Sequence, residues 1–366
     1  MQNKPISEQT VIGIDLGDRK HAICVLDKDG NIVREDTVLN ERKHLDQLAR
    51  EYPGARVAME VGTHSPWISR FLAKAGLEVF VANSRKLRAI YANERKSDQR
   101  DARMLARVAR LDPTLLSPIQ HGSEENQRDL LPIKLRDTLV RQRVAIINSI
   151  RGCLKALGLR ITAAGPTSFV KAARTALEEE TTLLTALEPS LTVLEELCTR
   201  IREYDKAIER CAAARHPQAG KLQAIAGVGP ITSLSFVLAI EDPGRFEDAR
   251  EVGPYLGLVP RRDQSGGSDK QLPISKTGNR YLRGLLVQSA QYILGNFGPE
   301  CDLRRWGLHL ASRGGKAAKK KAVIAVARKL AVMMLALWKN QGPYEAVRQP
   351  KPAAAKLRST PAPLAA

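Results

Sequence analysis

A short apolar run that ends in a carboxylate, residues 11–17, constrains the fold of this chain more than any other stretch. β-Branched residues dominate its first half, which predicts a buried strand, while Gly13 and Gly17 leave room for another backbone or a ligand to approach. An aspartate in such a run is costly to bury without a partner. We therefore expect Asp15 to lie at a strand end and to belong to a functional site.

The residues that follow predict a mixed α/β domain. Further short strands are expected over residues 22–26, 31–33, 56–60 and 77–81. The first three strands predict an antiparallel meander, and the fourth again ends in a carboxylate, Glu60, before a helix that begins near Ser65. After the fifth strand, a helix opens with Asp98 and Asp101, which share a face because they lie three residues apart.

These four acids predict a metal site if they converge. Convergent carboxylates repel one another unless a cation lies between them. Oxygen ligands suit Mg²⁺, and two such ions about 4 Å apart activate a nucleophile and stabilise a leaving oxygen in phosphodiester chemistry. Taken singly, each acid also has a structural explanation, as a turn former, a helix-entry acid or a first-turn acid that complements a helix dipole. Their joint order favours the functional interpretation.

The segments around these acids resemble a known family. Ile-Asp-Leu-Gly at 14–17, Met-Glu-Val-Gly at 59–62 and Lys-Ser-Asp-Gln-Arg-Asp-Ala at 96–102 are similar to the N-terminal domain of the insertion sequence one-ten transposases, relatives of the pilin-gene invertase. The order Asp, Glu, Asp-x-x-Asp also resembles the ribonuclease H-like fold in its Holliday-junction resolvase (RuvC-like) version. The resemblance implies an α/β domain of that fold, in which Asp15, Glu60, Asp98 and Asp101 bind Mg²⁺.

The charge balance predicts a polyanionic partner. Lys and Arg number 58 against 39 Asp and Glu, a formal net charge of +19, which makes nucleic acid the default partner. Many of these cations flank the third and fourth acids: Arg85, Lys86, Arg88, Arg95, Lys96, Arg100, Arg103, Arg107 and Arg110. Such cations suit a phosphate backbone that crosses the site, and we count Arg100 among the nucleic-acid contacts. Arg103, Arg107 and Arg110 also fit a solvated helix face.

The sequence predicts neither a membrane span nor a zinc site. No stretch approaches the ~20 apolar residues that a span needs, and the N-terminus lacks the apolar core of a signal peptide, so we expect a cytoplasmic protein. The five cysteines form no CxxC pair, and the six histidines form no HxxxH or HExxH spacing.

A helical middle part follows a connector at residues 111–123. Apolar residues recur at a spacing of three and four over residues 124–157, and helical patterns continue over 168–215. We predict a coiled-coil hairpin, an arm that spaces the domains and pairs protomers. The alternative is a local helical bundle inside the monomer. Basic residues on the first helix could also follow a nucleic-acid backbone.

Two features of the C-terminal part predict phosphate binding. Residues 222–234 are typical of two short helices that meet at Gly227 and Gly229, a helix-hairpin-helix whose backbone N–H groups hold a phosphate. A glycine turn that only links packed helices is the alternative. Further helices are expected over about 249–256, 301–311 and 317–338, and Lys319, Lys320 and Lys321 make the last of them a basic patch or a solvated helix end.

Residues 261–270 contain a serine followed by two glycines, ahead of a basic helix start. From the residues alone, Ser265 is a candidate nucleophile, but a flexible turn is the more common use of Ser-Gly-Gly. Ser268 and Ser275 compete with it, although Ser275 suits a helix N-cap better. We predict phosphate contacts at Lys276, Arg280 and Arg283.

The resemblance extends to this region and favours the nucleophile over the flexible turn as the role of Ser265. Gly-Leu-Val-Pro at 257–260, Gln-Ser-Gly at 264–266 and Ser-Lys-Thr-Gly-Asn at 275–279 are similar to blocks of the transposase domain of the same family. The nucleophilic serine of that family corresponds to Ser265. The resemblance therefore implies that Ser265 attacks a phosphodiester and forms a 5′-phosphoserine link.

We thus predict a ribonuclease H-like domain over residues 1–112, a coiled-coil arm over 113–216, a mainly α transposase domain with the helix-hairpin-helix and the serine over 217–345, and a disordered tail over 346–366. The resemblance implies a transposase that cuts and rejoins double-stranded donor and target DNA, guided by an RNA that the element encodes. It also implies a homo-oligomer, dimer or tetramer, in which the metal domain of one protomer meets the serine domain of another. A junction nuclease that uses water and a non-enzymatic architectural binder remain open as alternatives.

Overall fold

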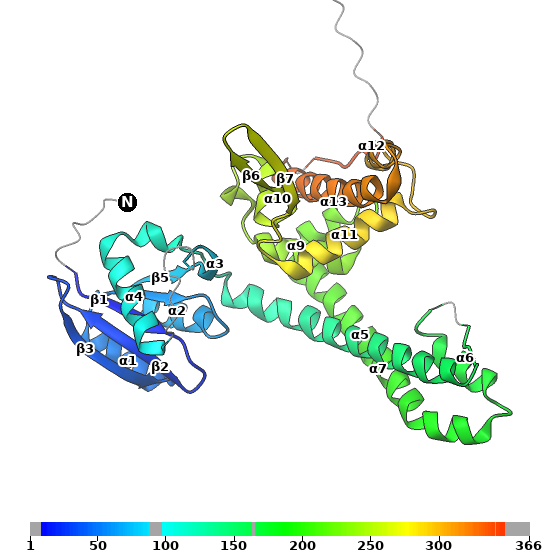
Figure 1. The fold of residues 1–366 in the computed structure, drawn as a ribbon, viewed down its shortest axis with the longest axis horizontal. Coiled ribbons are helices and arrows are strands. Elements are labelled where there is room, and N and C mark those ends of the chain that lie inside the picture. Colours follow the sequence, from blue (N-terminus) through cyan, green and yellow to red (C-terminus); the bar gives the residue numbers. More distant parts are fainter. Residues whose placement is uncertain (1–8, 88–96, 163–164, 341, 348–366) are drawn as a thin grey trace, which may run out of the picture. The chain divides into compact units, whose positions relative to one another are not determined.

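The computed structural model describes residues 9–87, 97–162, 165–340 and 342–347. The chain divides into two compact units, residues 1–124 and 125–366 (Figure 1). Most of the predicted arm, residues 113–216, falls within the second unit, and its residues 113–124 fall within the first. The predicted tail lies outside the described residues, apart from its first two.

A five-stranded sheet forms the centre of the first unit. Its strands are β1 (Val11–Asp15), β2 (Lys20–Leu26), β3 (Ile32–Leu39), β4 (Arg56–Glu60) and β5 (Glu78–Ala82), in the order β3-β2-β1-β4-β5. The predicted antiparallel meander of β1, β2 and β3 is confirmed. β4 is parallel to both β1 and β5. The mixed α/β architecture predicted from the strand patterns is thus present.

Helices cover both faces of this sheet (Figure 1). They are α1 (Arg42–Glu51), α2 (Ser65–Lys74), the short α3 (Ser84–Leu87) and α4 (Asp98–Leu111), followed by the 3₁₀ helix η2 (Pro113–Leu116). Large aliphatic residues such as Ile12 and Ile14 pack against α1 and α2. Small residues such as Ala22 and Ala58 face α4. Because side chains alternate along a strand, one face is bulky and the other lets a helix approach closely.

α4 approaches β1 very closely at Gly13. A Cβ atom at this position would lie 1.9 Å from the carbonyl oxygen of Ala102 and 2.6 Å from the amide nitrogen of Ala106. The backbone of α4 therefore rests directly on β1, and only glycine leaves the space that this packing needs.

Replacement of Gly13 by alanine is expected to destabilise the first unit by about 3 kcal/mol, because the added methyl group has to push α4 away from β1. Urea unfolding, together with hydrogen exchange of the α4 and β1 amides, would measure the effect. Gly62→Ala is the matched control, since a Cβ there meets nothing within 4 Å. Equal stability of the two variants would contradict the close packing.

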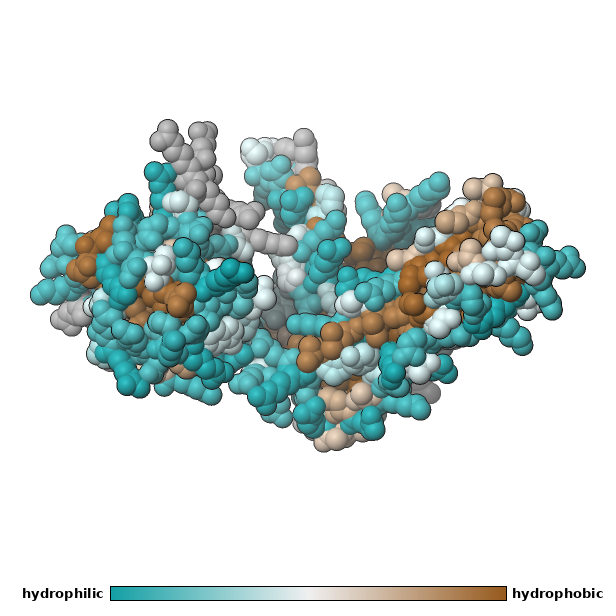
Figure 2. Space-filling model, turned by 90° about the horizontal axis from the view of Figure 1, so that it is seen from below, coloured by the Kyte–Doolittle hydropathy of each residue, from teal (hydrophilic) through white to brown (hydrophobic). Residues whose placement is uncertain are grey.

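Two long helices, α5 (Glu124–Ala156) and α7 (Thr181–Arg215), begin the second unit, with α6 (Phe169–Ala176) between them. The predicted helical patterns are confirmed here. One end of the pair shares a cluster with α6 that includes Phe169 and Leu191, while Ile133 and Ile208 belong to the larger core of the unit. Apolar residues remain exposed along the pair, among them Leu135 and Val144 on α5 and Val193 on α7, and Figure 2 shows a hydrophobic stripe along these helices.

The larger core of the second unit is mostly helical. Its elements are α8 (Pro217–Leu222), α9 (Pro230–Ile240), η3 (Pro243–Arg245), η4 (Ala249–Glu251), α10 (Val252–Tyr255), β6 (Pro260–Ser265), β7 (Ser268–Ile274), α11 (Arg280–Leu294), α12 (Asp302–Ala311) and α13 (Gly315–Asn340). α9 lies at its centre, with Leu234, Phe236 and Leu238 all buried. α11 and α13 pack against each other beside it.

The predicted Ser-Gly-Gly turn is present at residues 265–267, and it joins two strands that were not predicted, β6 and β7. One expectation for this unit is wrong. Ser275 does not cap a helix, because it follows β7 directly and α11 begins at Arg280. The cap is Asn279, whose side-chain oxygen accepts a hydrogen bond from the Leu282 amide at 3.0 Å.

Candidate active site

Asp15 and Glu60 lie at the same edge of the sheet. Ile14 of β1 is opposite Met59 of β4 in a parallel pair, so the next residue of each strand is the carboxylate. Both side chains are half-buried at the carboxyl ends of neighbouring strands. The parallel pairing thus brings together two acids that lie far apart along the chain.

The direction of α4 brings the other two acids to this edge. The Arg56 guanidinium, at the start of β4, donates to the Ala109 carbonyl near the end of α4 at 3.2 Å. The Gln99 side chain, near the start of α4, donates at 2.7 Å to the carbonyl of Ile23, which is opposite Ile14. α4 therefore runs antiparallel to β1, and Asp98 and Asp101 in its first turn lie at the edge where β1 and β4 end.

The start of α4 favours negative charge. The Ser97 side chain caps the helix by accepting a hydrogen bond from the Arg100 amide at 3.4 Å. The helix dipole places partial positive charge at this end, which stabilises carboxylates in the first turn. Asp98 is exposed and Asp101 half-buried, so both are accessible for a cation.

Some of the predicted flanking cations have structural partners. Arg103 forms a bidentate pair with Glu35 at 2.7 and 2.8 Å, which holds the pKa of that carboxyl below its usual range. Arg110 donates to the Lys28 carbonyl at 3.2 Å. Lys86, Arg100 and Arg107 are exposed. The side chain of Arg85 and all of Arg88, Arg95 and Lys96 lie outside the described residues.

Polar groups that the sequence interpretation missed gather at the same end of the strands. The His64 ring nitrogen Nε2 lies 3.2 Å from Oδ1 of Asp18, which links the loop after β1 to the start of α2. The Ser65 hydroxyl lies 2.9 Å from Nε2 of His121, and burial lowers the pKa of His121. The sequence offered one clue to their location, because Asp18 and His64 each follow a strand-end acid by a few residues.

The four acids share an edge without closing into a coordination shell. Within the described ranges, the group that brings three ligand atoms within 4.8 Å of one another is Asp129, Cys211 and His216, in the second unit. The all-oxygen donor set at the sheet edge fits a hard divalent ion, which would offset the repulsion between carboxylates.

The Asp129 group fits a structural ion network better than a metal site. The Arg215 guanidinium contacts the buried Asp129 carboxylate and lies 3.3 Å from Sγ of Cys211. His216 Nε2 lies 2.7 Å from the other oxygen of Asp129. Because an arginine already supplies the positive charge between the sulfur and the carboxylate, these contacts tie the start of α5 to the end of α7.

Ser265 lies at the tip of the β6–β7 hairpin. It is opposite Ser268 across a two-residue turn of Gly266 and Gly267, and it is exposed. Gly266 has φ +55°, which glycine adopts without strain and which suits the first position of such a turn. The hairpin therefore presents the Ser265 hydroxyl to solvent. The Ser268 side chain lies outside the described part of the structure.

The two sequence blocks next to the hairpin pack against each other. A Cβ at Gly257 would lie 2.4 Å from the Thr277 amide nitrogen, and one at Gly278 would lie 2.0 Å from the Tyr255 carbonyl oxygen. The Arg283 side chain is buried and donates to the carbonyls of Leu256 at 2.9 Å and Thr277 at 2.7 Å. This arginine joins the two blocks, so we withdraw it from the predicted phosphate contacts.

The other predicted phosphate contacts remain accessible. Lys276 and Arg280 are exposed beside the hairpin. Lys319, Lys320 and Lys321 are exposed near the start of α13. Gly227 and Gly229 form the turn between α8 and α9, where Gly227 has φ +78° and Gly229 is the N-cap of α9.

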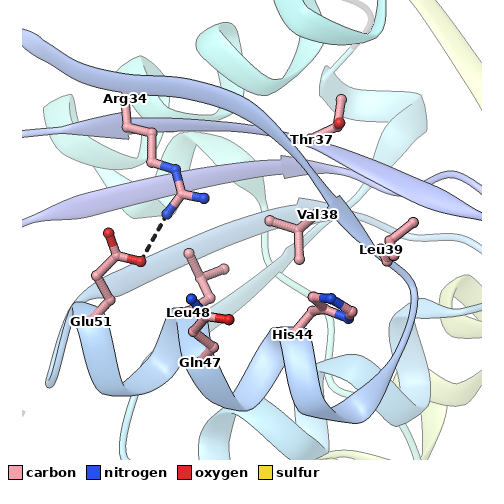
Figure 3. A pocket seen from close by; sticks show the side chains of 8 residues that line it. All are labelled: Arg34, Thr37, Val38, Leu39, His44, Gln47, Leu48 and Glu51. Atoms are coloured by element: carbon pink, nitrogen blue, oxygen red, sulfur yellow. Dashed lines mark hydrogen bonds and ion pairs between the residues drawn. The ribbon is translucent and has the colours of Figure 1, made fainter.

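A cavity of about 260 Å³ lies elsewhere in the first unit, between β3 and α1 (Figure 3). An ion pair of 2.8 Å between Arg34 and Glu51 crosses one side of it, and Val38 and Leu48 contribute apolar surface. None of the predicted site residues lines this cavity.

Comparison with known proteins identifies the class. A DEDD transposase domain matches residues 12–158, and the transposase domain of the IS116/IS110/IS902 family matches residues 219–303. Together the two matches cover more than half of the chain and define a DNA transposase. The chain belongs to the IS110 family of insertion-sequence transposases. The family resemblance predicted from the sequence motifs is confirmed.

Relatives of similar length support this assignment. The transposase for insertion sequence element IS1111A of Coxiella burnetii is 28% identical over 350 residues, which is 94% of this chain and 93% of the relative. The transposase for IS1328 of Yersinia enterocolitica is 29% identical over 77% of this chain and 83% of its own length. The pilin gene-inverting protein of Moraxella bovis is 30% identical over 37% of this chain and 41% of its own length.

The family defines the substrate and the type of cofactor. A transposase acts on DNA, and a DEDD transposase domain implies the use of a divalent metal ion. In the described part of the chain, no helix is both long and apolar enough to cross a membrane.

Proposed function

We propose that this transposase is a Mg²⁺-dependent serine recombinase guided by an RNA that its own element encodes. Metal binding is supported by the arrangement at one edge of the sheet. Asp15 and Glu60 lie there at the ends of parallel strands, and Asp98 and Asp101 lie in the first turn of α4. We assign this unit to the ribonuclease H-like, RuvC-like folds. The strand order and the helices on both faces support that assignment.

We assign metal binding to the four carboxylates. Asp15 and Glu60 offer oxygens from neighbouring strand ends, and Asp98 and Asp101 offer them from the helix start. A bound divalent ion supplies a Lewis acid for phosphodiester oxygens. The helix dipole at Asp98 and Asp101 and the half-buried positions of Asp15, Glu60 and Asp101 favour carboxylates that are ready for that ion.

Ser265 is our proposed nucleophile. Its Oγ attacks a phosphorus atom of the DNA backbone and loses its proton, while the bond to the 3′ oxygen breaks and that oxygen leaves as a hydroxyl after protonation. A 5′-phosphoserine link results. A 3′ hydroxyl of another strand then attacks the phosphorus and releases the serine, so that each phosphodiester broken is replaced by a new one. The exposed hairpin tip supports this role, because a long DNA substrate reaches it without obstruction.

We propose three groups of nucleic-acid contacts. Arg100 lies beside the acids, Lys276 and Arg280 lie beside the hairpin, and Lys319, Lys320 and Lys321 begin α13. The turn at Gly227 and Gly229 adds backbone N–H groups at the start of α9. Cations and amides of this kind bind the backbone of DNA and RNA alike.

We also propose that the enzyme works as a homo-oligomer. The exposed apolar stripe along α5 and α7 supports pairing of protomers through this arm. Such pairing would allow the metal domain of one protomer to act with Ser265 of another.

Purification of the protein together with its nucleic acid tests RNA guidance. We expect sequencing to recover an RNA from the region next to the transposase gene. The complex should join donor and target DNA in Mg²⁺, and joined products should be lost after ribonuclease treatment. Addition of the sequenced RNA should restore them, while a scrambled RNA of equal length should not. Joining that persists without RNA would overturn this part of the proposal.

A further inference from the structure

The turn after α11 exposes an aromatic ring. Phe297 is 90% exposed, whereas the other phenylalanines are buried or half-buried: Phe71, Phe80, Phe169, Phe236 and Phe246. Aromatic residues make up only 4% of this chain. An aromatic side chain that lies outside the hydrophobic core is therefore unusual in this chain.

Hydrogen bonds hold the backbone of the turn that carries this ring. The Gly298 amide donates to the Gly295 carbonyl at 3.2 Å, which closes a turn around Phe297. The Arg304 guanidinium donates to the carbonyls of Ile293 and Gly295 at 2.5 and 2.6 Å. A Cβ at Gly298 would lie 2.1 Å from the Ile293 carbonyl oxygen. The turn is thus fastened to the end of α11, which lowers the entropy cost of using the ring in binding.

The turn between α8 and α9 packs on the same end of α11. A Cβ at Gly227 would lie 3.1 Å from Cγ1 of Ile293 and 3.3 Å from Cδ1 of Tyr292. Tyr292 is itself 50% exposed. Ile293 therefore lies beside both the Gly227 turn and Gly298, so the N-terminus of α9, Tyr292 and the turn that carries Phe297 lie at the same end of α11.

The surroundings of Phe297 favour a nucleobase over an apolar protein partner. Glu300 lies three residues after Phe297, and Arg305 pairs with both Glu300 and Asp302, so an ion-pair cluster follows the turn. A protein interface would need a broad apolar area, whereas an exposed ring close to charged groups provides the flat surface on which a base stacks. The net charge of +19 also favours nucleic acid.

We infer that Phe297, together with Tyr292, stacks on an unpaired base of a nucleic-acid strand whose phosphate is bound at the Gly227 turn. The ligand class is a single-stranded or unpaired nucleotide, in DNA or RNA. The inference rests on the proposed function in one respect, since it needs a nucleic-acid partner. It adds a site that reads the π-face of a base, while the cations contact the backbone.

Binding of labelled oligonucleotides to the nucleic-acid-free protein tests the inference. Single-stranded DNA, single-stranded RNA and duplex DNA of equal length are compared by fluorescence anisotropy. Phe297→Ala should weaken single-strand binding about 10-fold, as expected for the loss of one stacked base, and leave duplex binding unchanged. Phe297→Trp should keep the affinity, and its added indole fluorescence should be quenched on binding. The stronger single-stranded ligand identifies whether DNA or RNA supplies the base.

Leu308→Ala is the matched control, because Leu308 is an exposed apolar residue of neighbouring α12. Wild-type affinity of Phe297→Ala for both single strands would overturn the inference. A change in oligomeric state of that variant, measured by mass photometry, would overturn it in favour of a protein contact. If the wild-type protein binds none of the three ligands, the proposed function fails as well. If only the Phe297 effect is missing, the stacking site alone fails.

Discussion

Replacement of Ser265 by alanine is expected to abolish the covalent protein–DNA link and to reduce strand joining by on the order of 10³-fold or more. The reason is chemical, because in the proposed mechanism the Ser265 Oγ holds the phosphoryl group between cleavage and rejoining. Without this oxygen, the 5′ phosphate of the broken strand cannot be linked to the protein and then passed to another strand. Denaturing electrophoresis of end-labelled DNA with the protein would show the adduct in the wild type and none in the variant.

The control for this variant is Ser268→Ala, across the same turn of the hairpin. This variant removes a neighbouring hydroxyl but keeps the proposed nucleophile, so we expect both the adduct and the joined product to persist. A Ser265→Ala protein that still cuts and joins DNA would favour the alternative, a metal-dependent junction nuclease in which water is the nucleophile. Binding of DNA should be unchanged in both variants, so that a loss of joining reports chemistry.

An Asp15→Asn substitution is expected to reduce strand cleavage by on the order of 10³-fold, because it removes one negative charge and one strong oxygen ligand from the sheet edge. The substitution preserves the shape of the side chain, so the strand should remain intact. Cleavage rates over a range of Mg²⁺ concentrations would measure the effect, and calorimetry would measure the weakened binding of the ion.

Asp46→Asn is the matched control, since Asp46 lies on α1 of the same unit and pairs with Arg50. We expect its activity and its Mg²⁺ dependence to equal those of the wild type. Full activity of Asp15→Asn would remove the metal site from the proposal. If Asp98→Ala also kept every activity, a non-enzymatic architectural binder would become the better interpretation.

Much of the first unit could be predicted from local patterns. Apolar runs with β-branched residues indicated the strands around Ile12 and Val57, and both are strands. The positions of Asp15 and Glu60 at strand ends followed directly from those runs. These features are local, because the apolar pattern of a few consecutive residues is enough to indicate a buried strand.

The second unit shows why other features could not be predicted. All six residues of β6 are exposed, so no apolar alternation marked it as a strand. Arg283 looked like a phosphate contact because it follows two other cations, but its buried guanidinium donates to the nearby Thr277 carbonyl and to the carbonyl of Leu256, 27 residues away. Tertiary contacts of this kind leave no periodic signal.

The sequence by itself determined the residue types of the candidate site, the strand ends that carry two of its acids and the glycines that allow its turns. Only the tertiary structure decided that these acids share one edge of the sheet. Asp15 and Glu60 are neighbours because β1 and β4 pair in parallel, and Asp98 and Asp101 join them because α4 packs on Gly13 in the opposite direction. The physical reason is that strand pairing and close helix packing join residues far apart in the chain. A local sequence pattern indicates only which of its own residues are buried, and not which distant residues lie beside them.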